Sequence, residues 1–382
     1  RIMKKLAALV CAACLLAPLA AAQDTKRYDV LELPAVQSPL AERALVYSLT
    51  RAGDRVFATG IRGHSLYSDD FGQSWVQAES VPVRSSLLDA AFPTPEQGWV
   101  VGHDGVVLHS SDGGKSWVKQ LDGVRLAQIG LDHYRKKQEQ EPDNERFAFL
   151  VDEMTLATEQ AADRPFFRVV MDDARSGFAA GAYGLLFRTE DGGESWFPVM
   201  ELLDLDQLVH LFDHAALAPA PAAGDVAATD AVAPQEFLTG EMGTLLTLDP
   251  STGHWRRLDF PYDGSMFTLL ATRGGTLVTG GLRGLVFRST DRGLTWQEAN
   301  KPQTSSVVAG TVLADGRVVI ATQEGNLFLS VDEGVNFTPL PVEDPKPVSD
   351  LLEGRPGELI MSGSFGLRVQ RLPAAVAAAQ QP

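Results

Sequence analysis

Short apolar runs alternate with glycine-containing turns along most of the chain, and the alternation itself repeats. In the second repeat, Leu87–Phe92, Gly98–Val101 and Val106–His109 are three such runs, and Trp117–Lys119 opens a fourth. Runs of this length between turn residues predict short antiparallel strands. The tight turn Gly102–Gly105 has glycine at both ends, which suits a hairpin because such turns require positive φ.

A glycine recurs at the corresponding turn of every repeat. The seven positions are Gly63, Gly105, Gly184, Gly243, Gly284, Gly325 and Gly366. Successive steps are 41 or 42 residues, except for a step of 79 after Gly105 and a step of 59 after Gly184. A period near 40 residues with several strands per unit is typical of a β-propeller blade. Since one small sheet cannot bury both of its faces alone, we predict an all-β, seven-bladed β-propeller.

The turn after the third strand carries the motif Ser/Thr-x-Asp-x-Gly-x-Ser/Thr-Trp, known as an Asp-box. Its aspartates and tryptophans are Asp70, Asp112, Asp191, Asp291, Trp75, Trp117, Trp196 and Trp296, and Asp332 belongs to a weaker copy. We expect each carboxylate to accept hydrogen bonds from turn N–H groups and each indole to pack at the blade edge. One carboxylate per turn favours this structural role over a catalytic or calcium-binding one.

The last repeat ends at Leu372 without a fourth strand. The segment Arg27–Leu33 alternates apolar and polar residues before the first blade. We predict that it pairs as the outer strand of blade seven, which closes the ring and covers an open edge. The propeller is then expected over residues 23–372, followed by a disordered tail at 373–382.

The long step after Gly105 contains a predicted helical insertion at residues 123–165. Val124–Glu141 is rich in Gln, Lys and Glu, and Asn144–Ala162 has an apolar face. That face consists of Phe147, Leu150, Val151, Met154 and Ala161. We expect a helical hairpin over or beside the central channel, either as a partner-docking element or as an insertion that only packs its apolar face on the ring.

The step after Gly184 contains residues 215–234, which are almost entirely Ala, Pro, Gly, Asp and Thr. This composition cannot bury a core, so we expect a flexible loop on the opposite face of the ring.

The first residues have the pattern of an export signal. Lys4 and Lys5 precede the apolar run Leu6–Leu19 and three alanines that end at Ala22. We interpret residues 1–22 as a cleaved signal peptide and expect a periplasmic protein. A membrane anchor is disfavoured because the run is shorter than the roughly 20 residues that span a bilayer, and a lipoprotein site at Cys14 is a weaker alternative.

Composition narrows the partner class. The formal net charge is −16, so a nucleic acid is an unfavourable partner. Both cysteines, Cys11 and Cys14, lie in the predicted signal, which leaves no disulfide or thiol chemistry. His210 and His214 have the spacing of a zinc pair on a helix, but they fall where a strand is expected. We therefore expect no metal and no cofactor.

Two stretches, GWVVGHDGVVLHSSDGGKSW and GFAAGAYGLLFRTEDGGESW, resemble the blades of the photosystem II stability/assembly-factor family of seven-bladed propellers. The resemblance covers roughly Arg27 to Leu372. It includes exported proteins of non-photosynthetic bacteria, often with a helical insertion after the second blade. It implies a non-catalytic scaffold that helps a membrane complex to assemble or stay stable.

The turn positions depart from what that resemblance implies. Family members that serve photosystem II present an arginine patch, whereas the positions here are Arg62, Asp104, Tyr183, Met242, Arg283, Glu324 and Phe365. The mixture favours another partner, and family association suggests a membrane transporter of the resistance-nodulation-division type. We predict partner-binding residues at Arg62, His103, Tyr183, Arg283, Glu324 and Phe365, and a monomer.

The alternative is a sialidase-like glycoside hydrolase or glycan-binding propeller, because those proteins also carry Asp-boxes. Sialidase chemistry needs three arginines around a carboxylate and a Tyr–Glu pair. The chain offers Arg62, Arg273 and Arg283, with tyrosines such as Tyr47, Tyr183 and Tyr262. No Tyr–Glu pair falls at matched blade positions, so we expect no enzyme activity.

Overall fold

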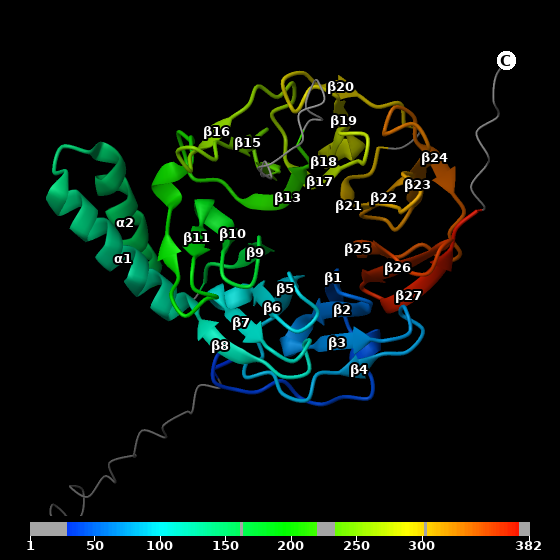
Figure 1. The fold of residues 1–382 in the computed structure, drawn as a ribbon, viewed down its shortest axis with the longest axis horizontal. Helices are drawn as coiled ribbons and strands as arrows, with labels where there is room; N and C mark the ends of the chain where they lie inside the picture. Colours follow the sequence, from blue (N-terminus) through cyan, green and yellow to red (C-terminus); the bar gives the residue numbers. More distant parts are fainter. Residues whose placement is uncertain (1–28, 161–162, 220–233, 302–303, 374–382) are drawn as a thin grey trace, which may run out of the picture.

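The computed structural model describes residues 29–160, 163–219, 234–301 and 304–373. Seven small antiparallel sheets surround a common axis, and each is arranged radially (Figure 1). The predicted seven-bladed β-propeller is confirmed. The predicted signal peptide and residues 374–382 of the predicted tail lie outside the described residues.

Each blade is built from strands that follow one another from the axis to the rim. The innermost strands are β1 (Val46–Ala52), β5 (Leu87–Ala91), β9 (Phe166–Met171), β13 (Leu211–Leu217), β17 (Met266–Ala271), β21 (Val307–Val312) and β25 (Val348–Glu353). The second strands are β2 (Arg55–Gly60), β6 (Gly98–Gly102), β10 (Gly177–Gly181), β14 (Gln235–Gly240), β18 (Leu277–Gly281), β22 (Val318–Thr322) and β26 (Glu358–Gly363).

The outer half of each blade is shorter. The third strands are β3 (Ser65–Ser68), β7 (Val107–Ser110), β11 (Leu186–Thr189), β15 (Leu245–Leu248), β19 (Val286–Ser289), β23 (Leu327–Ser330) and β27 (Gly366–Arg371). The fourth strands are β4 (Val76–Gln77), β8 (Val118–Leu121), β12 (Phe197–Pro198), β16 (Trp255–Arg257), β20 (Gln297–Glu298) and β24 (Thr338–Leu340). Among the described residues, blade seven has three strands and the other six blades have four.

The second strands explain why the repeat reads as apolar runs. Every residue of β6, β10, β18 and β22 is buried. A strand with neighbouring blades against both of its faces has no solvent face, so its sequence is continuously apolar or small rather than alternating. The core of the protein is therefore a series of layers between blades.

The innermost strands are joined across the seams between blades by carboxylates. The Oδ2 atom of Asp89 accepts the N–H of Val169 in the next blade at 2.9 Å. Asp213 accepts that of Leu269 at 2.7 Å and Asp350 that of Leu49 at 2.8 Å. The last of these bonds joins blade seven to blade one. A side chain thus supplies hydrogen bonds where two separate sheets meet.

Arg168 of blade three links two of these carboxylates. Its guanidinium donates to Asp89 at 2.9 Å and to Asp213 at 2.7 Å. Burial alone would lower the pKa of Arg168, but Asp213 and Asp89 outweigh burial and raise it. Burial raises the pKa of Asp89 although Arg168 opposes the change. The three side chains form a charged cluster close to the axis that spans blades two to four.

The Asp-box turns are closed by their own side chains. In blade two, the Oδ1 atom of Asp112 accepts the N–H groups of Lys115 at 3.0 Å and Ser116 at 2.9 Å. Ser110 Oγ accepts the N–H of Gly114, whose φ is +82°. The indole N–H of Trp117 donates to the carbonyl of Gly114 at 3.1 Å. The same carboxylate-to-N–H bond occurs at Asp70, Asp191, Asp291 and Asp332.

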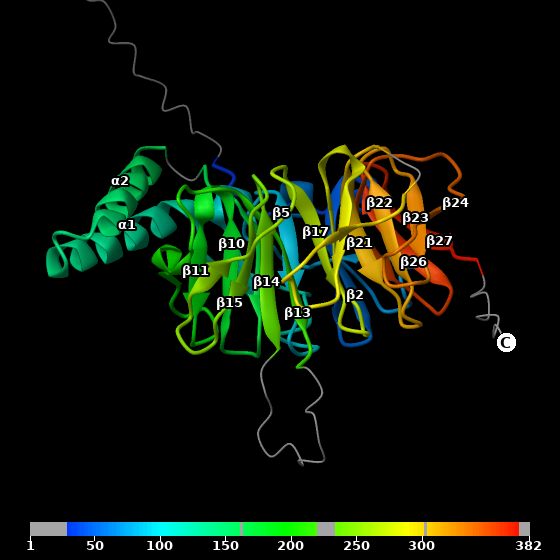
Figure 2. The same cartoon turned by 90° about the horizontal axis from the view of Figure 1, so that it is seen from above.

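The insertion forms two antiparallel helices, α1 (Gly123–Gln140) and α2 (Glu145–Glu159). Asp122 and Asn144 are their N-caps, because each side chain accepts an N–H of the first turn. Figures 1 and 2 show the hairpin projecting from the rim beside blade three rather than over the axis, which corrects the expectation that it stands at the central channel. Within the described part of the chain, neither helix has the length and apolar character needed to span a bilayer.

Packing explains this placement. Leu126, Tyr134 and Met154 of the hairpin are fully buried in one apolar cluster with Phe187 and Trp196 of blade three. The apolar face predicted for the second helix is therefore turned toward the outer part of blade three at Phe147, Leu150 and Met154, while Ala161 lies outside the described residues. Burial of that face against the blade leaves the hairpin no contact with the axis.

The predicted closing strand is wrong for the part that the structure describes. Residues 29–33 form a turn, and Leu31 is buried in an apolar cluster with Val81 and Val83 between blades one and two. Lys119 of blade two also donates to the carbonyl of Leu31 at 3.1 Å. These contacts hold the segment on the far side of blade one from β27, while Arg27 lies outside the described residues.

The predicted Ala/Pro loop at 215–234 begins later than expected. Ala215–Leu217 are the end of β13, paired with Gln235–Phe237 of β14. Composition could not predict this strand end, because alanines form a strand through pairing with a neighbouring strand rather than through their own propensity. Residues 220–233 lie outside the described residues.

Asp112 tests the energetic role of the turns. Asp112→Ala removes the acceptor for two backbone N–H groups and the partner of two hydroxyl groups. We expect the free energy of unfolding to fall by about 1–2 kcal/mol in a chemical denaturation experiment. Ser111→Ala, at the exposed neighbouring position, is the control and is expected to be near neutral. Equal stability of Asp112→Ala and wild type would contradict this role.

Asp350 predicts a pH-dependent stability. Burial raises the pKa of Asp350 to about 7, whereas the unfolded chain titrates near 3.8. Between these values the unfolded state loses the proton first, so stability is full at low pH and is lost as pH rises through 7. Asp350→Asn cannot ionise. We expect its stability deficit against wild type to shrink by on the order of 2–3 kcal/mol between pH 5 and pH 8. An unchanged deficit in chemical denaturation at the two pH values would rule this out.

Candidate partner-binding face

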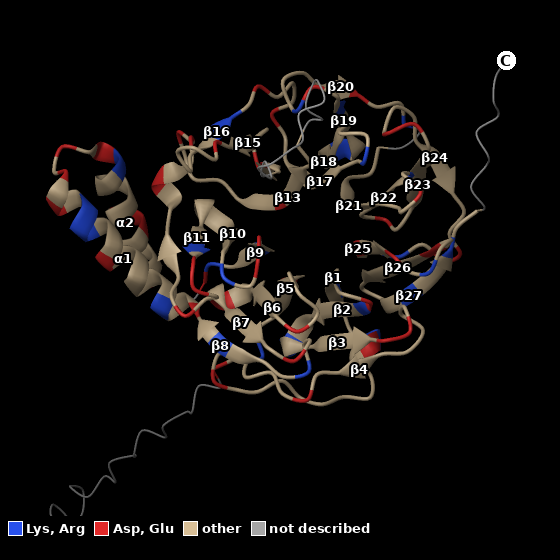
Figure 3. Ribbon diagram, viewed as in Figure 1, with Lys and Arg blue, Asp and Glu red and all other residues tan. Residues whose placement is uncertain are grey.

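The turns between second and third strands all lie on one face of the ring, which we call the turn face. Its tips are Arg62, His103, Tyr183, Met242, Arg283, Glu324 and Phe365, of which Phe365 is half-buried and the others are exposed. The structure thus brings the six predicted partner-binding residues to one face, spread over six blades. Figure 3 shows basic and acidic positions interspersed around the ring.

Five of these turns hold a non-glycine residue in the left-handed region. The φ angles are 56° at Arg62, 58° at Asp104, 53° at Tyr183, 55° at Met242 and 59° at Arg283. A residue with a Cβ atom pays about 1–2 kcal/mol for this conformation, which glycine and asparagine adopt more easily. The side chains are therefore held in fixed directions at the tips of the turns, at a cost in stability.

The seventh turn differs. Gly363 lies opposite Gly366, so the turn has only the two residues Ser364 and Phe365. In blade two, the three residues His103–Gly105 separate the paired positions Gly102 and Val106, whose N–H and carbonyl are bonded. The Phe365 ring instead packs under the guanidinium of Arg368 at 4.6 Å. Phe365 is consequently less available to a partner than the sequence suggested.

Tyr183 connects the turn face to the helical hairpin. The guanidinium of buried Arg164 lies 5.1 Å from the centre of the Tyr183 ring and donates to Glu153 of α2 at 3.4 Å. A cation over an aromatic face is attracted by the ring's negative quadrupole. The exposed tip of blade three is therefore linked to the second helix through a buried side chain.

The base of the hairpin is fixed through Glu201. Its carboxylate accepts the hydroxyl of Tyr134 at 2.8 Å and also contacts Lys137 and His133 of α1. Burial raises the pKa of Glu201, but its contacts with His133 and Lys137 outweigh burial and lower it to about 2. The hairpin is thus held to blade three by a buried ionic contact as well as by its apolar face.

An aromatic cluster near the axis escaped the sequence reasoning. The rings of Phe167, Phe212 and Phe267 follow one another on neighbouring innermost strands, with centroids 5.8 Å and 5.2 Å apart. His210 joins Tyr183 at 4.9 Å and Phe167 at 5.7 Å. The three phenylalanines and His210 are half-buried, and each phenylalanine occupies a β-bulge at the start of its strand.

A signal for this cluster was present in the sequence. Each phenylalanine is the second residue of its innermost strand, directly after a fully buried residue, in three consecutive blades. In a single sequence such residues are indistinguishable from core residues. A bulge reverses that expectation, since the extra residue turns a side chain toward the axis.

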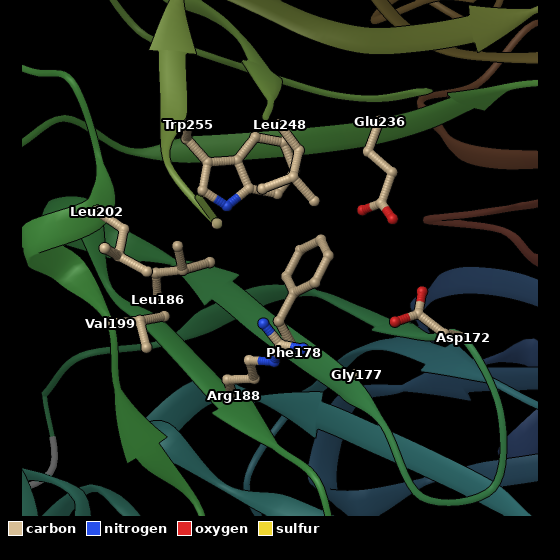
Figure 4. A pocket seen from close by; sticks show the side chains of 11 residues that line it. Asp172, Gly177, Phe178, Leu186, Arg188, Val199, Leu202, Glu236, Leu248 and Trp255 are labelled. Carbon is tan, nitrogen blue, oxygen red and sulfur yellow. The ribbon is translucent and has the colours of Figure 1, made fainter. Parts of the chain in front are cut away.

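The opposite face has a small pocket between blades three and four (Figure 4). It has a volume of about 70 Å³, and Phe178, Leu186 and Trp255 form its apolar part. The carboxylates of Asp172 and Glu236 lie beside Phe178 and point toward each other. Burial and the neighbouring Glu236 raise the pKa of Asp172. No tyrosine is among its described lining residues, so it offers no sialidase-like nucleophile.

The residues considered for other chemistries do not converge. Arg62 and Arg283 lie on the turn face, but Arg273 lies in the turn between β17 and β18 on the opposite face. A carboxylate cannot be held by all three. His210 contacts Tyr183 on the turn face, whereas His214, further along β13, lies near Glu236 of β14. Among the described residues, no group of His, Cys, Asp and Glu side chains has the geometry of a metal site.

Known proteins match the chain at two levels. The family described as "Photosynthesis system II assembly factor YCF48" matches residues 68–132. The photosystem II assembly lipoprotein Ycf48 of Nostoc sp. (strain PCC 7120 / SAG 25.82 / UTEX 2576) is 44% identical over 68 residues, which is 17% of this chain and 20% of that protein. The photosystem II assembly protein Ycf48 of Synechococcus sp. (strain JA-2-3B'a(2-13)) is 47% identical over 53 residues, 13% of this chain and 16% of that protein. The chain thus spans about a fifth of the length of the curated relatives it matches.

Solved structures extend the likeness to the whole fold. A structure described as YCF48 bound to D1 peptide aligns with a TM-score of 0.61 at 16% identity, over 90% of this chain and 100% of that chain. YCF48 from Cyanidioschyzon merolae aligns with a TM-score of 0.60 at 14% identity, over 89% and 99%. At such identities the likeness concerns the fold. In the local sequence around its second blade and in its seven-bladed fold, the chain resembles the photosystem II assembly-factor family of Ycf48.

Proposed function

We propose that the chain is a non-catalytic binding scaffold of the cell envelope. It is exported to the periplasm by a cleaved signal peptide, and its turn face docks a membrane protein complex that it helps to assemble or stabilise. The names of the relatives support a role in assembly, and one similar structure contains a bound peptide. A transporter of the resistance-nodulation-division type is the partner class to test first.

The observation that carries the proposal is the set of left-handed residues at the turn tips. Glycine or asparagine at Arg62, Tyr183, Met242 and Arg283 would relieve backbone strain. Strained non-glycine residues that persist on an exposed surface favour a role outside folding. Their side chains are large and differ in charge, which suits a protein surface better than a small symmetric ligand.

The helical hairpin extends this surface outward. Its second helix buries Leu150 and Met154 against the ring, but Phe149 and Leu156 on the other side are 37% and 41% exposed. Together with Glu145, Asp152 and Glu159 they form one exposed stripe of α2 at helical spacing. An apolar stripe between carboxylates on a rigid helix is a common form of protein-binding surface.

A double substitution at the turn tips separates partner binding from folding. Arg62→Asn with Arg283→Asn places a residue that tolerates left-handed φ at both tips, so we expect the free energy of unfolding to stay equal or rise by up to about 1 kcal/mol. Capture of the partner complex from detergent-solubilised membranes should be lost.

The matched control is Arg175→Asn with Arg273→Asn. It removes the same two charges from exposed turns of the opposite face and should leave capture intact. Full capture by the turn-face variant, or equal loss in both variants, would refute the assignment of the turn face.

The second prediction concerns the stripe of α2. Deletion of residues 124–164 would expose the apolar cluster around Phe187 and Trp196. A loss of partner binding in that variant could then result from misfolding. Phe149→Glu with Leu156→Glu instead changes only exposed positions. We expect an unchanged melting temperature and at least a tenfold loss of partner affinity, as is usual when apolar anchors are replaced. Val331→Glu, 73% exposed on blade six, is the control. Unchanged affinity of the double variant would show that the hairpin does not dock the partner.

A further inference from the structure

Blade seven has an open outer edge. In the six other blades of the described chain a fourth strand pairs with the third strand, whereas β27 is the last strand of its sheet. The first residues of β27 lie against the 3-10 helix η1 (Ala41–Arg43), since a Cβ atom on Gly366 would meet the carbonyl of Glu42 at 2.1 Å. The remainder of the edge runs from Leu367 to Arg371.

The register identifies the backbone groups at this edge. The N–H of Leu372 donates to the carbonyl of Gly357 at 2.8 Å. Bonded pairs alternate along an antiparallel ladder, so Arg368 and Gln370 bond inward to β26 while Leu367 and Val369 direct their N–H and C=O groups outward. No bond to the N–H of Leu367 or Val369 comes from any residue that the structure describes.

The same positions are paired in a complete blade. In blade two, Val107 and His109 of β7 correspond to Leu367 and Val369, because both strands follow directly from the bonded pair that closes the turn. Val107 lies opposite Leu121 and His109 opposite Val118 in the fourth strand. The edge of blade seven therefore has backbone groups placed to pair with a fourth strand, and the described chain supplies no such strand.

In each complete blade an aromatic residue lies at the start of the fourth strand or directly before it, and its side chain packs on the preceding blade. The Trp117 ring of blade two lies 5.4 Å from Phe57 of blade one, and Trp255 of blade four lies 5.5 Å from Phe178 of blade three. In the latter seam, the indole packs near Leu186 and Val199, which lie on the third strand of blade three and directly after its fourth strand. Every complete blade thus fills a position on its neighbour.

The corresponding position on blade six is a pocket. Leu327 and Leu340 match Leu186 and Val199 by their place in the blade. They line a pocket of about 230 Å³ whose other residues are Pro341, Gln370, Arg371, Leu372 and Pro373. A cavity of about 150 Å³ already admits a benzene ring. We call this pocket the aromatic slot.

We propose that the open edge of blade seven binds an extended segment of a partner protein. The segment adds as a fourth strand along Leu367–Val369 and inserts an aromatic side chain into the aromatic slot. Backbone bonds supply the pairing and the slot selects the side chain. Residues 374–382 contain no aromatic residue, so these nine residues do not match the slot.

Positive charge beside the aromatic slot indicates which residues the partner segment carries. Arg371 is exposed and lines the slot. Arg317 donates to the carbonyl of Pro373 at 3.1 Å, but its guanidinium is already paired with Asp315 at 2.7 Å. The exposed guanidinium of Arg371 next to an apolar pocket favours a carboxylate near the aromatic residue of the segment. This surface lies on the rim, apart from the turn face, and the inference does not depend on the function proposed above.

The test uses a fluorescent peptide of this protein's own blade two, residues 110–121, whose Trp117 and fourth strand have the required form. Fluorescence anisotropy with the full chain should show saturable binding. The W117A peptide should bind about tenfold more weakly or worse, because burial of an aromatic side chain is lost.

Backbone pairing is tested by N-methylation of the peptide. Methylation at Val118, which lies opposite an outward-facing residue in blade two, should abolish binding. Methylation at Lys119, the next residue, should not. Equal binding of the two methylated peptides, or of the wild-type and W117A peptides, would overturn the proposal.

Variants of the protein locate the site. Leu340→Asp places a charge in the aromatic slot and should weaken peptide binding, while Val331→Asp, exposed on the same blade, should not. Melting temperatures check that both variants fold. Tighter peptide binding after removal of residues 374–382 would show that the tail occupies the edge. Concentration-dependent dimers that exclude the peptide would show that a second copy does so, and either result would overturn the assignment to a partner.

Discussion

The closure of the ring rests on contacts between innermost strands at the axis. Six of the seven seams join blades that follow one another along the chain, but the seam between blades seven and one joins segments about 300 residues apart. There the carboxylate of Asp350 accepts the N–H of Leu49. Arg168 crosses two further seams by bonding Asp89 and Asp213. Buried charges are costly unless each is paired, and these carboxylates accept backbone N–H groups as well.

An apolar cluster between blades seven and one, in which Ile360 packs with Val56 and Leu66, adds to the contacts at the axis. With closure supplied by these contacts, the connections and fourth strands at the rim can vary. The hairpin α1–α2 replaces a short connection beside blade three without changing the order of strands in that blade. Blade seven lacks a fourth strand in the described chain and is still joined to blade one. A propeller closed by pairing at the rim could accept neither change so easily, since loss of an outer strand would open the ring. The two places where the rim differs most from blade to blade are the hairpin and the edge of blade seven, and both are surfaces for which we propose partners.

The sequence predicted what is local and repeated. The blade period, the Asp-box residues such as Asp112 and the two helices follow from turn chemistry and periodicity over short stretches. The position of residues 29–33 could not be predicted, because alternation marks a strand without naming its partner, and Leu31 found an apolar cluster between two other blades. The pairing of Arg168 with Asp89 and Asp213 was also invisible, since these residues are distant in sequence and meet only after the ring closes.

The turn face combines a nearly sevenfold framework with tips of mixed chemistry. A ligand bound on the axis would favour similar side chains from successive blades, whereas the two arginines, Arg62 and Arg283, lie on blades one and five, and blades three and four between them present Tyr183 and Met242 on closely matching backbones. Identical backbone strain is therefore tolerated in order to present different groups at fixed directions. Such a surface can distinguish only a partner that lacks the symmetry of the ring, because rotation by one blade would bring each group against the wrong complement. The physical features of these turns thus favour one protein held in one orientation over a small or repetitive ligand.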